Sequence, residues 1–298
     1  MLTYDIIKAK AKELGASVCG IGRVYQDSNP QRDPLMILPH AKTVIGFGFA
    51  IPKGIFKAMD RGVQQYTYTT LAVKYLDEEM AEIFLLKIGA MIENEGYDAC
   101  LQKNVPNLRI KGDKTTNPEV MDTYELIHAE AVAPGKPAPD VIIDFGTAAK
   151  ACGIGETGLS GKILNKDYGP FMRYCFIITD AEFDKYDEPL TDPICDKCGA
   201  CKAACPGNAI SDNGLDTWQC SVYYKGAHKS NPFMTDDFLA GNPEKEAIIN
   251  GENKFDAESA RALYPYMNFL PNTQWGYAPC LCGKKCDIAC YKHLKGEL

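Results

Sequence analysis

Apolar residues recur with two periods along the first 180 residues, and together the periods predict a mixed domain. Residues 3–14 place isoleucine and leucine on one helical face, with Thr3 able to cap the start and Gly15 able to end the helix. Residues 70–95 have apolar side chains at three- and four-residue steps, which predicts a long helix packed on a sheet. These side chains are Leu76, Met80, Ile83, Phe84, Ile88, Met91 and Ile92.

Short apolar runs predict the strands of this domain. They cover residues 17–21, 43–50, 141–143 and 174–179, and their length and β-branched content favour strands over helices. The polar stretch 103–138 is predicted to be a long loop over the core. Helices and strands therefore alternate, which indicates an α/β (α+β) domain.

The acidic, proline-containing stretch 182–193 predicts a linker. We therefore expect a cofactor-binding domain over residues 1–185 and a second domain over residues 186–298. No run approaches 18 uncharged apolar residues, and the start has no cationic segment followed by an apolar one. With a net charge of −7, these features lead us to expect a cytoplasmic protein with no membrane or DNA partner.

Thirteen cysteines are the outlying feature of the composition, and nine of them lie between residues 195 and 290. In a reducing compartment this clustering indicates metal ligation rather than disulfides. The run Cys195-Asp-Lys-Cys198-Gly-Ala-Cys201-Lys-Ala-Ala-Cys205-Pro206 has the spacing of bacterial ferredoxins that bind two [4Fe–4S] clusters. Zinc sites rarely use this spacing. We therefore expect a ferredoxin-like domain with an insertion at about 225–275.

In such ferredoxins the fourth cysteine of a run binds the other cluster. By this rule the first cluster takes Cys195, Cys198, Cys201 and Cys290. The second takes Cys205, Cys220, Cys286 and either Cys282 or Cys280, and the C-x₃-C-x₃-C spacing favours Cys282. Clusters that exchange ligands lie close together and form a short path for single electrons. The other four cysteines are interpreted as small buried hydrophobes: Cys19, Cys100, Cys152 and Cys175.

A glycine-rich segment at residues 153–158 matches the G-x-G-x-x-G pattern of dinucleotide-binding folds. Such folds need a strand before the segment and a helix after it, whereas residues 147–151 look helical and no convincing helix follows. Two interpretations remain. The segment is a structural turn, or its bare backbone lies against another large cofactor, because glycine permits close approach.

A family resemblance emerges in the stretch from Ala148 to Asp180, which leads into the cysteine run. With its GIGETGLSG segment, Asp167-Tyr-Gly-Pro170 and Arg173, the stretch resembles the epoxyqueuosine reductase and reductive dehalogenase superfamily. The resemblance implies a domain that holds cobalamin in a base-off form, with no protein ligand to cobalt, above the two-cluster domain. The expected cofactor contacts are Gly153, Gly155, Glu156, Gly158, Tyr168, Gly169 and Arg173. For Glu156, Tyr168 and Arg173 a solvated or ion-paired role is the alternative.

Two tyrosines precede the predicted long helix, where members of this superfamily place a catalytic tyrosine. Reductive bond cleavage consumes protons, and a tyrosine is a suitable donor. The resemblance implies this catalytic role for Tyr68, with Tyr66 as the next candidate. Simple packing with a hydrogen-bonded hydroxyl is the alternative for both.

The chain departs from the epoxyqueuosine reductases in one motif. Residues 139–144 read Pro-Asp-Val-Ile-Ile-Asp where those enzymes have an acidic residue in a D-S-A-P context, so the substrate stays open. We expect an oxidoreductase of anaerobic metabolism that passes electrons through two [4Fe–4S] clusters to cobalamin, for reductive cleavage of a small-molecule or nucleoside-type substrate. A low-potential donor such as ferredoxin or flavodoxin would feed it. The alternative is an electron-transfer protein that reduces a partner corrinoid or flavoprotein and has no substrate site of its own.

Overall fold

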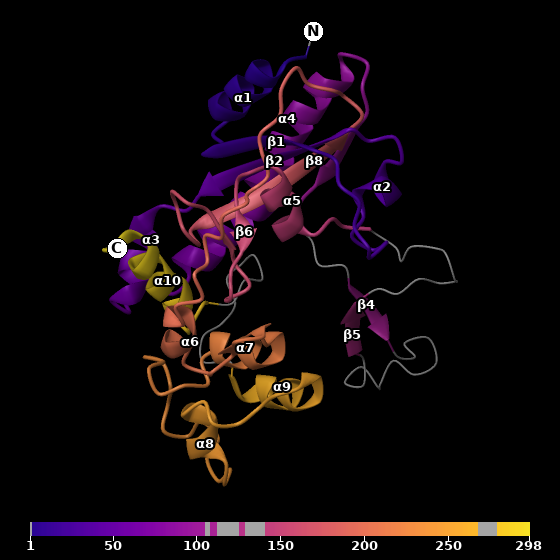
Figure 1. The fold of residues 1–298 in the computed structure, drawn as a ribbon. Coiled ribbons are helices and arrows are strands. Elements are labelled where there is room, and N and C mark those ends of the chain that lie inside the picture. Colours follow the sequence, from indigo (N-terminus) through magenta and orange to yellow (C-terminus); the bar gives the residue numbers. More distant parts are fainter. Residues whose placement is uncertain (1, 105–107, 112–124, 129–140, 268–278) are drawn as a thin grey trace.

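A four-stranded sheet forms the centre of the N-terminal part (Figure 1). The computed structural model describes residues 2–104, 108–111, 125–128, 141–267 and 279–298. The strands lie in the order β1 (Val18–Arg23), β2 (Thr43–Ala50), β8 (Met172–Thr179) and β3 (Ala99–Gln102). Every neighbouring pair is antiparallel, so this central sheet differs from the parallel sheet typical of alternating α/β folds.

Three of the four predicted strands are confirmed as β1, β2 and β8. The fourth prediction, a strand at residues 141–143, is wrong. Ile143 is buried in the core, but its segment has no strand partner, and the backbone N–H of Ile142 bonds to the carbonyl of Gln31 at 3.3 Å. The apolar character of these three residues reflects their burial, and it led to the prediction of a strand.

Two long helical segments cover one face of the sheet. Helix α1 (Tyr4–Glu13) begins at Thr3, whose side chain accepts the N–H of Ile6, as predicted. The predicted long helix consists of a π-helix, η1 (Tyr68–Met80), continued by α4 (Ala81–Glu93). Ile83, expected in the core, is 57% exposed. π-Helical geometry is rare beyond a single turn and is frequent at functional sites.

The opposite face of the sheet packs against α5 (Phe145–Ala151) and α2 (Pro34–Ile37). Side chains alternate along β8, so that Cys175 and Ile177 face α4 whereas Tyr174 and Phe176 face α5. After α5 the chain forms a short hairpin of β6 (Glu156–Thr157) and β7 (Ile163–Leu164).

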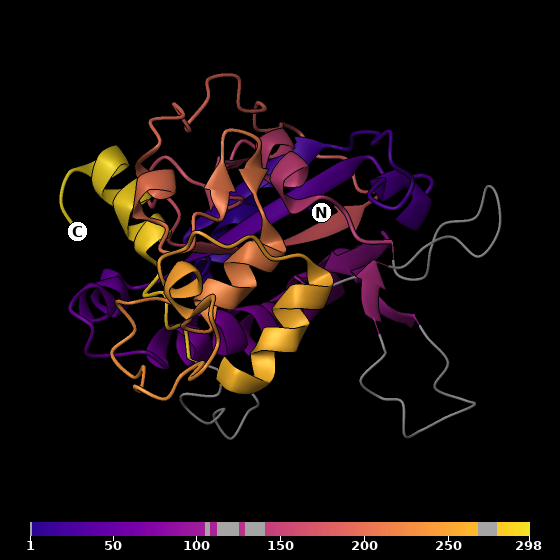
Figure 2. The same ribbon diagram turned by 90° about the horizontal axis from the view of Figure 1, so that it is seen from below.

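The predicted loop 103–138 contains a second antiparallel pair, so that prediction is wrong in part. Strand β4 (Leu108–Lys111) pairs with β5 (Glu125–His128). Figure 1 shows this pair standing away from the central sheet, and in Figure 2 it lies near the right side of the ribbon. The remaining residues between 105 and 140 lie outside the described part of the chain.

The stretch 182–193 has neither helix nor strand, in line with its acidic, proline-containing sequence, but it is fastened to the sheet. The Asp187 carboxylate accepts the N–H of Ile21 at 2.8 Å and the hydroxyl of Tyr4 at 2.6 Å. It also pairs with Lys8 at 2.8 Å. Residues 182–193 therefore hold a defined path between the two parts of the chain.

The C-terminal part is built from short helices around a small core of its own. It contains α6 (Ala200–Ala204), β9 (Ile210–Ser211), β10 (Gly214–Leu215), α7 (Thr217–Tyr224), α8 (Lys245–Ile249), α9 (Ala257–Leu263), η3 (Tyr264–Met267) and α10 (Lys285–Lys295). Helix α10 returns to pack on α6 and on α3 (Lys53–Asp60) of the N-terminal part (Figure 1). Within the described ranges, no helix has both the length and the apolar character that a bilayer span requires.

Candidate iron–sulfur and cofactor site

The thiols of the predicted first cluster line one small cavity. Cys195, Cys198 and Cys201 come from α6 and the loop before it, and Cys290 comes from α10. Gly199 has a φ of +80°, which lets the loop turn into α6. Cys198 is exposed, whereas Cys201 is buried. The fold thus gathers the four thiols that the crossed arrangement requires.

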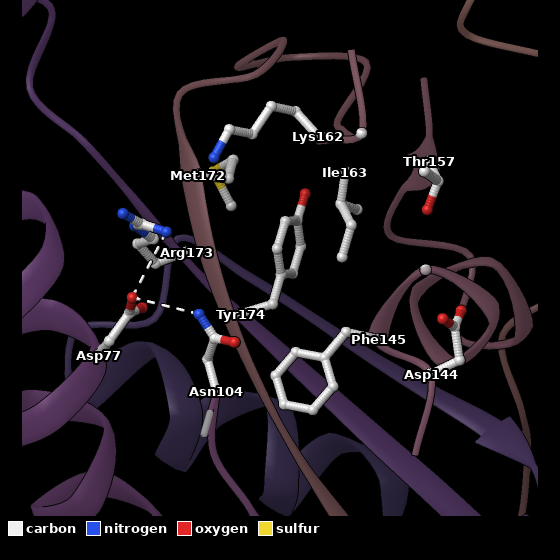
Figure 3. Close-up of a pocket in the computed structure, with 12 residues that line it drawn as sticks. Asp77, Asn104, Asp144, Phe145, Thr157, Lys162, Ile163, Met172, Arg173 and Tyr174 are labelled. Atoms are coloured by element: carbon white, nitrogen blue, oxygen red, sulfur yellow. Dashed lines mark hydrogen bonds and ion pairs between the residues drawn. The ribbon is translucent and has the colours of Figure 1, made fainter. Parts of the chain in front are cut away.

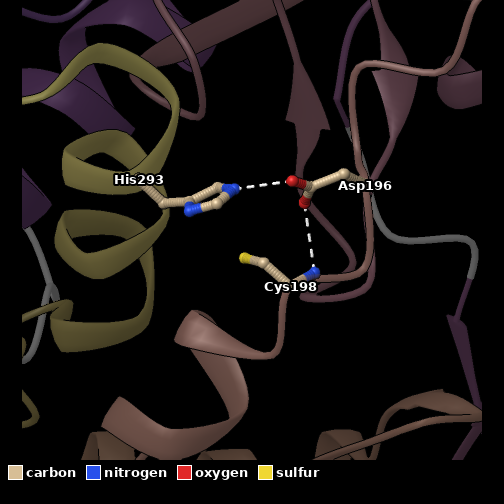
Figure 4. Close-up of side chains that lie close together, drawn as sticks. All are labelled: Asp196, Cys198 and His293. Carbon is tan, nitrogen blue, oxygen red and sulfur yellow. Dashed lines mark hydrogen bonds and ion pairs between the residues drawn. The ribbon is translucent and has the colours of Figure 1, made fainter.

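Two carboxylates hold the loop that carries these thiols. Asp196 bonds to His293 of α10 at 2.7 Å and accepts the N–H of Cys198 at 3.1 Å (Figure 4). His293 is the main cause that lowers the pKa of Asp196. From the β6 side, Glu156 accepts the backbone N–H groups of Ile194 and Cys195, the latter at 3.0 Å. Glu156, expected at a cofactor, therefore fixes the first cysteine loop.

The thiols of the predicted second cluster also lie near one another. Burial, with the nearby thiols of Cys282 and Cys205, raises the pKa of Cys220 to about 11. Cys286 likewise has Cys282 among its charged neighbours. The Sγ of Cys280 lies 3.7 Å from that of Cys282, but Cys280 is fully buried within an apolar cluster. The choice between Cys280 and Cys282 as the ligand stays a prediction.

A cavity of about 310 Å³ opens between the β6–β7 hairpin, the start of α5 and β8 (Figure 3). Phe145, Ile163 and Met172 supply apolar surface. The polar and charged lining residues are Asp77, Asn104, Asp144, Thr157, Lys162, Arg173 and Tyr174. This volume is at the lower end of the roughly 300–1,000 Å³ that small-molecule sites occupy.

Arg173, an expected cofactor contact, lines this cavity and is engaged on three sides. Its guanidinium pairs with Asp77 at 3.4 Å and donates to the carbonyl of Ala72 at 2.8 Å. It also donates to the hydroxyl of Tyr68 at 3.1 Å. Burial raises the pKa of Asp77, and the attraction of Arg173 opposes that shift only in part.

Tyr68, the first catalytic candidate, lies behind Arg173 and is 3% exposed. Its ring faces the Nζ of Lys284 at 5.1 Å, and Lys284 forms a buried pair with Asp287 at 3.1 Å. Tyr68 therefore links the cavity to the loop of the second cysteine set, but it is not among the described residues that line the cavity. Tyr66 is half-buried, and burial raises its pKa.

The glycines that were expected to contact a cofactor pack mainly against other residues of the chain. A side chain at Gly153 would come within 2.5 Å of the carbonyl of Glu188. At Gly158 it would meet Leu164 at 2.7 Å, and at Gly169 it would meet Tyr291 at 3.3 Å. The segment follows helix α5 and enters strand β6, the reverse of the order in a dinucleotide-binding loop.

Gly155 is the loop glycine nearest the cavity, since a Cβ there would lie 3.0 Å from the Tyr174 hydroxyl. Tyr168, another expected contact, packs against the core beneath the hairpin, and its N–H bonds to Asn165 at 3.2 Å. Of the seven expected contacts, Arg173 alone appears among the described lining residues.

Two cavity residues were missed at the sequence level, Tyr174 and Lys162. The Tyr174 hydroxyl is buried without a hydrogen-bond partner in the described part of the chain, and burial raises its pKa. Lys162 projects from the hairpin and is also an electrostatic neighbour of Cys220 and Cys286. Alternation along β8 was the available signal for Tyr174, since it placed Tyr174 and Cys175 on opposite faces.

The sheet with its helical layers defines a protein of mixed α and β structure, and the described residues place two sets of thiols and a cavity within it. No protein-family model matches the chain. An epoxyqueuosine reductase of Vibrio cholerae serotype O1 is 28% identical over 127 residues, which are 42% of this chain and 31% of that protein. The matched stretch thus spans less than a third of the length of this curated relative.

Solved structures show the same likeness at the level of the fold. The catabolic reductive dehalogenase NpRdhA, in complex with 3-bromo-4-hydroxybenzoic acid, aligns with a TM-score of 0.51 and 17% identity, over 87% of this chain and 35% of that chain. The expected resemblance is confirmed in sequence for the epoxyqueuosine reductases, and for the reductive dehalogenase it is confirmed at the level of the fold.

Proposed function

We propose that the protein is an iron–sulfur reductase in which two [4Fe–4S] clusters deliver electrons to a base-off cobalamin, for reductive cleavage of a small-molecule or nucleoside-type substrate. One observation carries the proposal. Lys162 lines the cavity, and its charge acts to lower the pKa of Cys220 and Cys286 in the second thiol set, which supports a cavity close to one end of the predicted electron path. The alternative electron-transfer role would not need such a cavity.

The thiol sets fit the clusters in their donor chemistry, since each set offers four cysteines and the run from Cys195 to Cys205 has the spacing of two-cluster ferredoxins. Cys195, Cys198, Cys201 and Cys290 would hold the first cluster, and Cys205, Cys220, Cys282 and Cys286 the second. We place the boundary between the cofactor domain and the ferredoxin-like domain near residue 185.

The cavity fits part of a corrin, because it combines apolar surface with a buried hydroxyl that lacks a partner in the described residues. A whole cobalamin is larger than a drug-sized ligand, so a cavity of about 310 Å³ would enclose only one portion of it. When bound, the clusters would supply single electrons of low potential and the cobalamin a strongly reducing metal centre.

The two thiol sets differ in exposure, and this difference gives the path a direction. Cys198 of the first set is exposed, so an external donor such as ferredoxin or flavodoxin can approach there. The second set lies next to Lys162 at the cavity. Electrons would therefore enter at the first cluster and leave from the second.

The proton required by the reaction has two candidate sources among the tyrosines. Tyr68 is separated from the cavity by Arg173, to which its hydroxyl is bonded. Tyr174 itself lines the cavity. A direct donor must lie within hydrogen-bond reach of the reacting group. We therefore propose Tyr174 as the nearer donor and retain Tyr68, with Tyr66 next, as the prediction from the family resemblance.

Cofactor loading tests the proposal. Anaerobically reconstituted protein is expected to contain about eight iron atoms per chain, as two [4Fe–4S] clusters require. It should also change the EPR spectrum of added cob(II)alamin and retain the corrin through a desalting column. Eight irons with an unchanged spectrum and no retained corrin would favour the electron-transfer alternative. Iron at four or fewer per chain would contradict both roles.

A further inference from the structure

Two hydrogen-bond donors of the cavity lack an acceptor among the described residues. The Tyr174 side chain is 6% exposed, and its hydroxyl is buried with no partner there. The Lys162 ammonium forms no hydrogen bond or salt bridge with those residues, although Lys162 lines the same cavity. Figure 3 shows Lys162 crossing above the Tyr174 ring, so both donors face one space. Leaving such a hydroxyl unpaired destabilises a fold, which indicates that a ligand supplies the acceptor.

The acidic groups of the cavity already have partners. Asp77 pairs with Arg173 at 3.4 Å. Asp144 caps α5, since it accepts the N–H of Thr147 at 2.8 Å, and it faces Arg32 at 3.6 Å. Neither carboxylate therefore requires a cation from a ligand. Among the described lining residues, the groups left without partners include the Lys162 ammonium and the buried Tyr174 hydroxyl. The complement of that pair is an oxygen acceptor with negative charge.

The rest of the cavity indicates what the acceptor is attached to. Phe145, Ile163 and Met172 form an apolar side of the cavity, which totals about 310 Å³. An apolar cavity of roughly 150 Å³ is enough for benzene. The space therefore accommodates a ring-sized apolar body together with a charged substituent.

We propose that the cavity is an oxyanion subsite in which Lys162 and Tyr174 bind a carboxylate or phosphate oxygen. The inference rests on the proposed function, because it assigns a ligand to the same cavity. The oxyanion has two sources that share this chemistry. It belongs to a carboxylate-bearing substrate, or it is the phosphodiester of the cobalamin nucleotide loop.

The first test is calorimetric titration of benzoate into cluster-reconstituted protein. Tyr174→Phe removes only the hydroxyl and should weaken binding about tenfold. Lys162→Met should weaken it by at least as much, and Lys162→Arg should retain most of it, because the charge is kept. Tyr25→Phe and Lys166→Met are the matched controls. Tyr25 has another buried hydroxyl without a described partner, Lys166 is exposed, and neither is among the described lining residues.

Titrations with cob(II)alamin and with cob(II)inamide, which lacks the nucleotide phosphate, separate the two sources. If the variants lose benzoate affinity but hold both corrins as wild type does, the oxyanion belongs to the substrate. If they weaken cob(II)alamin and leave cob(II)inamide unchanged, it is the cofactor phosphate. The inference would be overturned if both variants bound benzoate and both corrins as tightly as the wild type does. It would also be overturned if the wild-type protein bound neither benzoate nor a corrin. Benzoate binding that depends on Lys162 and Tyr174, in a protein that retains no corrin, would instead overturn only the cobalamin part of the proposed function.

Discussion

At the scale of single residues, the Tyr174 hydroxyl shows how a buried polar group without a hydrogen-bond partner can reveal a binding site. Tyrosine hydroxyls that are buried in a core normally find an acceptor. Tyr223 does so, because its hydroxyl donates to the carbonyl of Ile248 at 2.7 Å. The two side chains are therefore a matched pair, one satisfied by the chain and one not.

Substituting the two tyrosines with phenylalanine should have opposite effects on stability without ligand. Tyr174→Phe should raise the free energy of unfolding by about 1 kcal/mol, because a buried unpaired group is removed. Tyr223→Phe should lower it by about 1 kcal/mol, because the Ile248 carbonyl loses its donor. Anaerobic chemical denaturation measures both. Destabilisation of similar size in both variants would contradict the unpaired state of Tyr174.

The ninth cysteine of the C-terminal part can be assigned by iron content. We expect Cys282→Ala to lose about half of the iron, because Cys282 neighbours Cys220 and Cys286 in the second set. Cys280→Ala should keep all of it, because Cys280 lies among apolar side chains. Iron and sulfide analysis after reconstitution makes the comparison, and the reverse pattern would exchange the two roles.

At the scale of elements, the β6–β7 hairpin couples the cavity to the first cysteine loop. Lys162 and Ile163 line the cavity, while Glu156 on the same hairpin holds the backbone at Cys195. Hydrogen bonds to a carboxylate are about twice as strong as neutral ones. A displacement of the hairpin would therefore affect both sites.

Replacing Glu156 should weaken the binding of the proposed first cluster and leave the binding of the second unchanged. Glu156→Ala leaves the N–H groups of Ile194 and Cys195 without their acceptor. We expect loss of about half the iron on gel filtration, with an intermediate loss for Glu156→Gln, which retains one oxygen acceptor. Glu188→Ala, on the exposed segment near Gly153, is the control. Equal iron in all four proteins would show that the loop holds without Glu156.

The segment after α7 carries a buried histidine that should make stability depend on pH. Burial, with Lys285 nearby, lowers the pKa of His228 from 6.5 to about 4. Between these values the unfolded chain binds the proton and the folded chain does not, so stability falls as the pH drops from 6.5 towards 4. At pH 5.5 the loss is about 1.4 kcal/mol. His228→Gln should remove it when unfolding at pH 7.5 and 5.5 is compared, and an unchanged difference would contradict the neutral buried histidine.

The sequence predicted the elements whose signal is local and missed those that depend on tertiary contacts. The spacing of Cys195, Cys198 and Cys201 is a local signal, and so is the cap at Thr3. Ile143 was misread as part of a strand because a buried coil and a buried strand have the same apolar character. Lys162 was missed because its place at the cavity depends on how the hairpin packs on β8, which no periodicity encodes.

At the scale of the whole molecule, the proposed electron path runs from an exposed edge to an enclosed cavity. Cys198 is at the edge, and Lys197 beside it is exposed. The chain as a whole is acidic, with a net charge of −7, so an acidic donor would be repelled except where local positive charge attracts it.

Reduction of the first cluster by an acidic flavodoxin should therefore depend on Lys197. We expect Lys197→Glu to lower the bimolecular rate several-fold at low ionic strength, with the difference shrinking as salt is added. Lys254→Glu, an exposed substitution outside α6 and α10, should have little effect. Stopped-flow mixing of reduced flavodoxin with oxidised protein gives the rates. Equal rates for the two variants would place electron entry elsewhere.

Helix α10 supplies Cys286 to one thiol set and Cys290 to the other, and this arrangement bears on how the protein matures. During translation the sheet and its helices can emerge and pack while neither set is complete. Residue 290 must leave the ribosome before four thiols surround the first cluster, and the second cluster awaits residue 286. Iron insertion is therefore a late event, and a nascent chain halted before α10 would be unable to complete either proposed cluster.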